Sequence, residues 1–183
     1  GGGGGICYYG GAGVIEIINC IFAGNVSGGG GIGNGIATGG DCIIRNCTIA
    51  DNTYEGSNEG GGIGVYYCSP IIQNCIVWGN SSPQIYTEYA SPTIEYCDIQ
   101  DWTNGGTGNI TNDPQFISDS YHLWGDSSCI DAGISNGVLT DLEGENRWDA
   151  TNVADVVSIW DIGADEFVDT DYDKAPDWWE IEN

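Results

Sequence analysis

Carboxylate side chains near the C-terminus recur at intervals that could bind a cation. Within residues 169–180, positions 1, 3, 5, 9 and 12 are acidic and position 7 is alanine, which gives the set Asp169, Asp171, Asp173, Ala175, Asp177 and Glu180. Ca²⁺ takes about six to eight oxygen ligands, and these positions supply carboxylates and one backbone carbonyl in a twelve-residue calcium loop. The spacing predicts calcium as the cofactor of this segment, here called the C-terminal loop. Pro176 predicts that a helix begins directly after it.

One residue of the C-terminal loop is unfavourable for calcium. Lys174 lies at position 6, where the backbone turn normally requires glycine, and it also places a positive charge beside the ion. A non-glycine residue in a left-handed conformation adds strain of about 1 kcal/mol. The alternative interpretation is therefore an acidic, solvated linker that holds no metal tightly.

Two further residues could take part in chemistry. His122 is the single histidine of the chain and could act as a general base. Its Tyr-His-Leu context favours a structural role. Arg147 lies among Asp141, Glu143, Glu145 and Asp149, which favours an ion-paired structural arginine over a substrate-binding one.

The chain has eight cysteines, and four of them are evenly placed. Cys20, Cys47, Cys75 and Cys97 are separated by 27, 28 and 22 residues, and each shares a strand face with the apolar residue two positions later. We interpret them as a row of small buried hydrophobic side chains. A disulfide framework and a zinc site are the alternatives; stacked parallel side chains suit a disulfide poorly, and the cysteines lack close metal-ligand spacing.

The four cysteines belong to a seven-residue pattern that indicates a repeat. It reads Asn-Cys-Ile-Phe-Ala-Gly-Asn at residues 19–25, and related copies occupy 46–52, 74–80 and 96–102. A glycine run ending in Gly-Ile precedes the first three copies, at Gly5-Ile6, Gly31-Ile32 and Gly62-Ile63. A period of about 20 to 30 residues made of β-type segments predicts a solenoid of about four stacked coils.

Each copy also predicts a sharp corner. An isoleucine stands three residues before each cysteine, at Ile17, Ile44, Ile72 and Ile94. In a continuous strand, side chains three residues apart point to opposite faces of the sheet. For the isoleucine and the cysteine both to point into the core, the strand must be interrupted by a corner between them. Asparagine tolerates the left-handed backbone that such a corner needs. We expect corners at Asn19, Asn46 and Asn74, with their side chains hydrogen-bonded into a ladder that ends at Tyr96.

Composition excludes several classes of protein. The 183 residues include 31 glycines without a triplet period, which excludes collagen, and the net charge of −24 excludes nucleic acid and anionic membranes as partners. No stretch approaches the length of a membrane span. The chain contains no methionine, and with a repeat cut at Gly1 we expect an internal segment of a larger protein, monomeric within it.

The repeats resemble the right-handed parallel β-helix of pectate lyases and of many bacterial surface proteins. Residues 112–168 resemble the segment that closes many secreted β-helix proteins, as in Cys129-Ile130-Asp131-Ala132-Gly133 and Asp161-Ile162-Gly163-Ala164-Asp165-Glu166. The C-terminal loop resembles thrombospondin type 3 and EF-hand-like calcium repeats, although Tyr172 and Lys174 replace their glycines. The resemblance implies an all-β fold: β-helix coils at 1–110, a cap at 111–168 that covers the end of the solenoid, and a calcium-binding tail at 169–183.

Two functions are compatible with this organisation. The resemblance implies either a secreted or cell-surface scaffold, adhesin-like or carbohydrate-binding, or part of a polysaccharide lyase or glycoside hydrolase whose active site lies on other coils. Arg45 is the one base in the coils, and Asp51 and Asp101 lie two coils apart, about 10 Å by strand spacing, which disfavours catalysis. Aromatic residues for stacking on a glycan are Tyr66, Tyr67, Trp78, Tyr86, Tyr89 and Trp102. We therefore favour the non-catalytic interpretation, with a polysaccharide or cell-surface glycan as partner.

Overall fold

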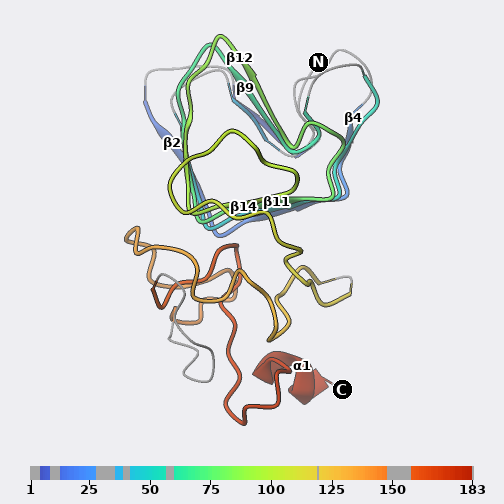
Figure 1. Ribbon diagram of the computed structural model, residues 1–183, viewed down its shortest axis with the longest axis vertical. Coiled ribbons are helices and arrows are strands. Elements are labelled where there is room, and N and C mark those ends of the chain that lie inside the picture. Colours follow the sequence, from blue (N-terminus) through green and yellow to red (C-terminus); the bar gives the residue numbers. More distant parts are fainter. Residues whose placement is uncertain are drawn as a thin grey trace.

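Short strands wind into stacked coils, and the rest of the chain packs against one side of the stack (Figure 1). The computed structural model describes residues 5–8, 13–27, 36–38, 42–56, 60–118, 120–147 and 158–182. In the described part of the chain, the single helix is α1 (Asp177–Glu182), and no helix is long and apolar enough to cross a membrane.

Four coils supply the strands, which follow from the apolar, β-branched composition of each segment. The first coil holds β1 (Ile6–Tyr8), β2 (Ile15–Ile18), β3 (Ile21–Ala23) and β4 (Val26–Ser27). The second holds β5 (Ile36–Thr38), β6 (Cys42–Arg45), β7 (Thr48–Ala50) and β8 (Thr53–Tyr54). The third holds β9 (Ile63–Tyr66), β10 (Ile71–Gln73) and β11 (Ile76–Trp78), and the fourth holds β12 (Ile85–Glu88), β13 (Thr93–Glu95) and β14 (Asp98–Ile99).

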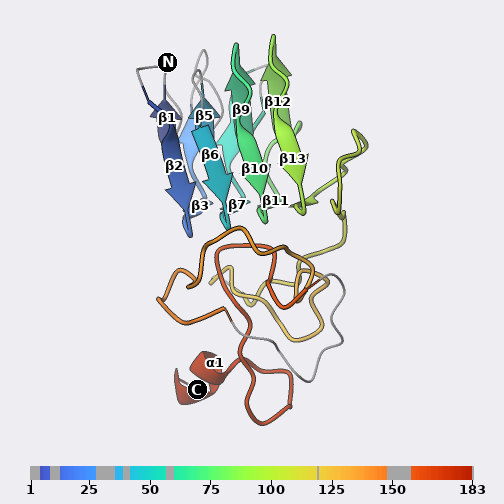
Figure 2. The same ribbon diagram turned by 90° about the vertical axis from the view of Figure 1, so that its left-hand side faces the viewer.

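Strands from successive coils pair in parallel. Three sheets have the orders β1-β5-β9-β12, β2-β6-β10-β13 and β3-β7-β11-β14, and β4 pairs with β8 in a fourth, two-stranded sheet. Figure 2 shows the coils side by side along the stack. This arrangement is a parallel β-helix, so the predicted solenoid is confirmed.

The isoleucine column forms the core of the solenoid, as its period predicts. Ile17 pairs in register with Ile44, Ile44 with Ile72, and Ile72 with Ile94, and all four side chains are buried. The Gly-Ile alignment is wrong in the second coil, because Ile36 is the residue that pairs with both Ile6 and Ile63. The proposed pair Gly31-Ile32 lies outside the described residues.

Left-handed corners occur where the sequence predicts them. The backbone φ angles are 52° at Asn19, 48° at Asn46, 50° at Asn74 and 51° at Tyr96. A second set of left-handed corners follows five residues later, at Gly24, Asp51, Gly79 and Asp101.

The hydrogen-bonded asparagine ladder lies at a different position from the predicted one. Asn25 Nδ2 donates to Asn52 Oδ1, Asn52 Nδ2 donates to Asn80 Oδ1, and Asn80 Nδ2 donates to Gln84 Oε1, each over 2.8 Å. These asparagines end the seven-residue patterns. We call them the inner ladder.

The corner asparagines instead bind the cap, which corrects the predicted ladder. Asn19 Nδ2 donates to the Thr140 carbonyl oxygen over 2.7 Å. Asn74 Nδ2 donates to the Ile134 carbonyl oxygen over 2.7 Å, and the Ile134 amide donates back to Asn74 Oδ1. The side-chain nitrogen Nδ2 of Asn136 lies 2.7 Å from the side-chain oxygen Oδ1 of Asn46.

The cap covers a lateral face of the solenoid and not its end, contrary to expectation (Figures 1 and 2). It packs on the outer face of the sheet that contains β7, β11 and β14. Ile76 points outward from β11 into a second apolar cluster, built otherwise from the cap residues Leu123, Cys129, Ile130, Ala132, Ile162 and Phe167. The Ala164 amide donates to Thr48 Oγ1 over 3.2 Å. An outward apolar residue thus determines where the cap attaches.

A partial turn closes the end of the stack. Ile110 pairs with Asp98, and the Tyr96 amide donates to the Thr107 carbonyl oxygen over 2.8 Å. Trp102 from this turn packs against the apolar core of the coils. Residues 100–110 therefore cover the strand edge that we expected the cap to cover.

Candidate metal centre

Three of the six predicted calcium ligands, Asp169, Asp171 and Asp173, converge in the C-terminal loop, and the cluster does not include Ala175, Asp177 or Glu180. One carboxylate oxygen each from Asp169, Asp171 and Asp173 lies within 4.8 Å of the others. Asp169 is buried, whereas Asp171 and Asp173 are exposed. Three carboxylates at this separation repel one another strongly unless a cation lies between them.

Backbone hydrogen bonds hold the C-terminal loop in a tight turn. Asp169 Oδ1 and Oδ2 accept from the amides of Tyr172 and Lys174 over 2.7 and 2.9 Å. Asp173 Oδ1 accepts from the amide of Ala175 over 2.8 Å. Tyr172 and Lys174 have φ angles of 68° and 79°, so the backbone adopts the conformation that glycine prefers and accepts the strain.

The end of the loop closes onto its start. Asp177 Oδ1 accepts from the amide of Thr170 over 2.7 Å, and the Asp177 amide donates to the Val168 carbonyl oxygen over 2.8 Å. Desolvation and the negative charges of the four loop aspartates raise the pKa of Glu180 above its usual value. Glu180 on α1 is therefore electrostatically coupled to the aspartates of the loop. The loop offers the hard oxygen donors that suit Ca²⁺.

The loop and α1 are attached to the cap. Lys174 Nζ forms an ion pair with Asp126, and the Gly125 amide donates to the Lys174 carbonyl oxygen over 3.2 Å. Lys174 thus points away to Asp126 and serves as an anchor. The rings of Trp124 and Trp179 pack edge to face, with their centroids 5.7 Å apart.

The cap buries an excess of acidic side chains. Its buried acids are Asp131, Asp141, Asp161, Asp165 and Glu166. Arg147 Nη1 forms a fully buried ion pair with Glu166 Oε2 at 2.8 Å, so Arg147 is structural as predicted, although its partner is not one of the acids nearest in sequence. Burial and the charge of Asp161 raise the pKa of Glu166, and Arg147 opposes this shift.

His122 lies beside two carboxylates in the structure, which the sequence analysis did not predict. His122 Nε2 lies 3.0 Å from Glu143 Oε1 and 3.7 Å from Asp165 Oδ1. The imidazole also packs on Trp178 of α1, at a centroid distance of 4.4 Å. The signal available in the sequence was the presence of the one histidine and both acids in the cap motifs, but nothing in their spacing shows that they meet.

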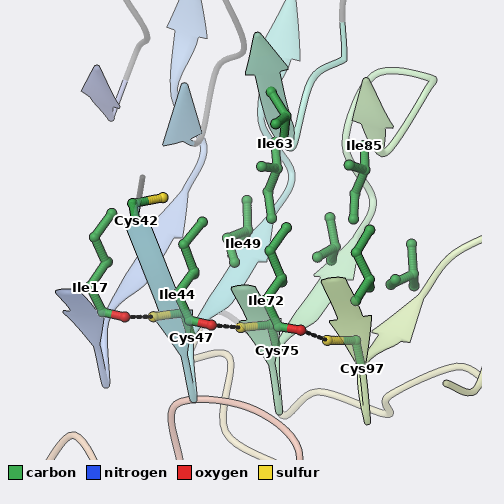
Figure 3. Close-up of a cluster of buried hydrophobic side chains, with 14 of the residues drawn as sticks. Ile17, Cys42, Ile44, Cys47, Ile49, Ile63, Ile72, Cys75, Ile85 and Cys97 are labelled. Atoms are coloured by element: carbon green, nitrogen blue, oxygen red, sulfur yellow. Dashed lines mark hydrogen bonds between the residues drawn. The ribbon is translucent and has the colours of Figure 1, made fainter. Parts of the chain in front are cut away.

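The cysteine row is a column of buried thiols that bond to the coil before (Figure 3). The thiols of Cys47, Cys75 and Cys97 face the carbonyl oxygens of Ile17, Ile44 and Ile72 at 3.6, 3.7 and 3.6 Å. All eight cysteines lie within the described residues, and none forms a disulfide there. Burial raises the pKa of Cys75 well above its usual value, so this thiol stays protonated. The buried-row prediction is confirmed for Cys47, Cys75 and Cys97, whereas Cys20 in the first coil is only half-buried.

The coil residues that the sequence analysis considered for catalysis are Arg45, Asp51 and Asp101, and the first two contact neighbouring coils or the cap. Arg45 pairs in register with Gln73, and Gln73 with Glu95, so one position carries a base, an amide and an acid. Asp51 Oδ2 accepts from the Tyr121 hydroxyl of the cap over 3.1 Å. Asp51 is therefore engaged with the cap.

Aromatic side chains occur at two places on the coils. Tyr67 and Tyr89 stack with centroids 5.1 Å apart, and they are 71% and 79% exposed. Trp102, which is half-buried, lines two cavities of about 420 and 450 Å³ at the closed end of the stack. Most of the polar lining residues belong to the cavity of about 420 Å³. They include Asn80, Gln84, Gln100, Asp101 and Asn104.

Comparison with known proteins supports the fold. The family model described as "Right handed beta helix region" matches residues 1–134. No curated protein and no solved structure matches the chain. The register of the parallel sheets and this match agree, and the chain belongs to the right-handed β-helix family.

Proposed function

We propose that this chain is a non-catalytic β-helix module of a secreted or cell-surface protein, and that its C-terminal loop binds Ca²⁺. The observation that carries the proposal is the convergence of Asp169, Asp171 and Asp173 within 4.8 Å in a loop closed by Asp177. Calcium would neutralise these charges and hold α1 against the cap. Extracellular calcium modules have dissociation constants of about 10⁻⁴ to 10⁻³ M, which suits a secreted protein.

Calorimetric titration with CaCl₂ tests this function. We expect one equivalent of Ca²⁺ to bind the chain and to raise its thermal midpoint. At calcium about 100-fold above the dissociation constant, the gain in the free energy of unfolding is about 2.7 kcal/mol. The double substitution Asp171→Asn and Asp173→Asn should abolish both effects.

A matched control separates ligation from net charge. Glu16 and Glu55 are exposed on the coils, outside the loop, so the double substitution Glu16→Gln and Glu55→Gln removes the same number of charges without touching the site. We expect this control variant to bind calcium as the unmodified chain does. Equal calcium affinity in the Asp171→Asn and Asp173→Asn double variant and the unmodified chain would refute the calcium proposal.

A glycan is the second candidate partner, favoured by the two cavities that Trp102 lines. A flat indole beside side-chain amides and a carboxylate is a surface that can stack on a sugar ring and bond its hydroxyl groups. The net charge of −24 disfavours a polyuronate, so we propose a neutral oligosaccharide as the ligand.

Titration with neutral hexasaccharides of glucose, xylose and mannose, followed by tryptophan fluorescence, tests the glycan proposal. Galacturonate hexasaccharide serves as the charged comparison. We expect at least one neutral sugar to bind, and Asn104→Ala to weaken it at least fivefold. Absence of binding up to 10 mM sugar, about the weakest useful affinity range, would refute the proposal. Weakening by Tyr89→Ala without any effect of Asn104→Ala would also refute it.

A further inference from the structure

We infer that the cap contains a separate site for a divalent transition cation of the Zn²⁺ type, formed by His122, Glu143 and Asp165. This site is distinct from the C-terminal loop and does not depend on the calcium proposal. Its three residues come from three segments of the cap, and one ligand atom from each lies within 4.8 Å of the other two.

The separations between the atoms fit a small cation. In a tetrahedral zinc site, bonds of about 2.0–2.2 Å place neighbouring ligand atoms about 3.4 Å apart. His122 Nε2 lies 3.0 Å from Glu143 Oε1 and 3.7 Å from Asp165 Oδ1, on either side of this value. The third separation, between the carboxylate oxygens of Glu143 and Asp165, is at most 4.8 Å.

The hydrogen bonds at the cluster leave one oxygen of a largely buried side chain without a donor. The side chain of Asp165 is 7% exposed, and its Oδ2 accepts from the Leu123 amide over 3.3 Å. Nε2 of His122 carries at most one proton, which the closer Glu143 accepts. Within the described residues, Asp165 Oδ1 therefore faces the cluster with no hydrogen bond of its own, and its lone pairs are available to a cation.

The charges around the cluster also favour a cation. Asp141 is buried beside this region, and its Oδ2 has no partner among the described residues. Arg147 is bound to Glu166 and Lys174 to Asp126, so neither forms an ion pair with Asp141, Glu143 or Asp165.

The donor types select a transition cation over calcium. An imidazole nitrogen with two carboxylates suits Zn²⁺, whereas Ca²⁺ prefers oxygen alone. Nε2 is the His122 nitrogen that faces the carboxylates, at 3.0 Å from Glu143 Oε1 and 3.7 Å from Asp165 Oδ1. The side chains of His122 and Glu143 are 15% and 39% exposed, which leaves a route for the ion and room for water as a further ligand.

Calorimetric titration of ZnCl₂ into the calcium-saturated full chain tests the site. Cys7 is exposed and could bind zinc, so all proteins carry Cys7→Ser. We expect one equivalent of Zn²⁺ with a micromolar dissociation constant, weakened at least tenfold by Glu143→Gln and by His122→Gln. Glu143 is part-exposed, so Glu143→Gln keeps the test valid if His122→Gln does not fold.

Matched controls locate the ion. Glu145→Gln removes a charge from the same turn outside the cluster and should leave the zinc affinity within twofold of the parent. The Asp171→Asn and Asp173→Asn double variant should also retain zinc binding. The inference is overturned if the parent binds no zinc, if Glu143→Gln has no effect, or if the loop double variant loses zinc.

Discussion

Removal of Asn52, the central side chain of the inner ladder, should strongly destabilise the solenoid. Asn52 is 1% exposed. Its Oδ1 accepts from the amide and the Nδ2 of Asn25 over 3.0 and 2.8 Å. Its Nδ2 donates to Phe22 O and to Asn80 Oδ1, both over 2.8 Å.

The expected cost of Asn52→Ala follows from these four hydrogen bonds. A buried hydrogen bond contributes about 1 kcal/mol net, and an orphaned partner costs about 1–3 kcal/mol. We therefore expect the free energy of unfolding to fall by about 3–5 kcal/mol.

Asn25→Ala is the internal control. Asn25 lies at the first coil and is only half-buried, and its side chain makes one bond in the inner ladder, to Asn52. Water can replace that bond, so we expect a loss of about 1 kcal/mol. Both variants remove an asparagine amide and leave alanine.

Urea unfolding followed by circular dichroism measures both losses by linear extrapolation. The slopes of the two variants should match that of the parent chain, so that the midpoints report stability alone. If the two variants lose stability equally, within about 0.5 kcal/mol, the inner ladder does not stabilise the coils in the way that the geometry indicates.

Three further outcomes are expected. Burial raises the pKa of Asp98 from 3.8 to about 7, so the folded state binds the proton more tightly and stability falls as pH rises through this window. Asp98→Asn should reduce that fall between pH 4 and pH 7.5 in urea unfolding, and the buried acids of the cap, whose pKa values are also raised, account for the rest; an unchanged dependence on pH contradicts it. Gly79→Ala should cost more than Gly24→Ala by thermal melting, because both have positive φ but only at Gly79 would a Cβ meet a carboxylate oxygen, at 2.1 Å. Ellman's reagent should label exposed Cys7 quickly in the native chain and buried Cys75 only after unfolding; labelling at equal rates would contradict the buried thiol column.

The local pattern was sufficient to predict the coils and their corners. The corner between Ile44 and Cys47 requires a left-handed residue, and Asn46 has that backbone conformation. The same reasoning misplaced the Gly-Ile alignment in the second coil, because Gly31-Ile32 and Gly35-Ile36 are locally equivalent. Only pairing with the neighbouring coils distinguishes them.

Tertiary contacts decided what the sequence could not. Each of the first three seven-residue patterns starts and ends with asparagine, and only the position of the cap shows which one faces outward. Ile76 could have indicated the covered face, because it is an apolar residue at an outward-facing strand position. His122, Glu143 and Asp165 meet through irregular segments, where no periodicity relates one residue to another. The acids of the C-terminal loop are close in sequence, so their convergence could be predicted.

The lateral cap changes how this solenoid can vary in length. Coils that contact only their neighbours unfold semi-independently and can be gained or lost as whole units. Here one cap segment binds Asn19, Asn46 and Asn74 in three successive coils. Deleting or duplicating a coil in this stretch would shift two of those contacts out of register by a strand spacing of about 4.8 Å. The contacts with the cap thus constrain the number of coils beside it. Because one cap segment binds three coils, we expect those coils to unfold together.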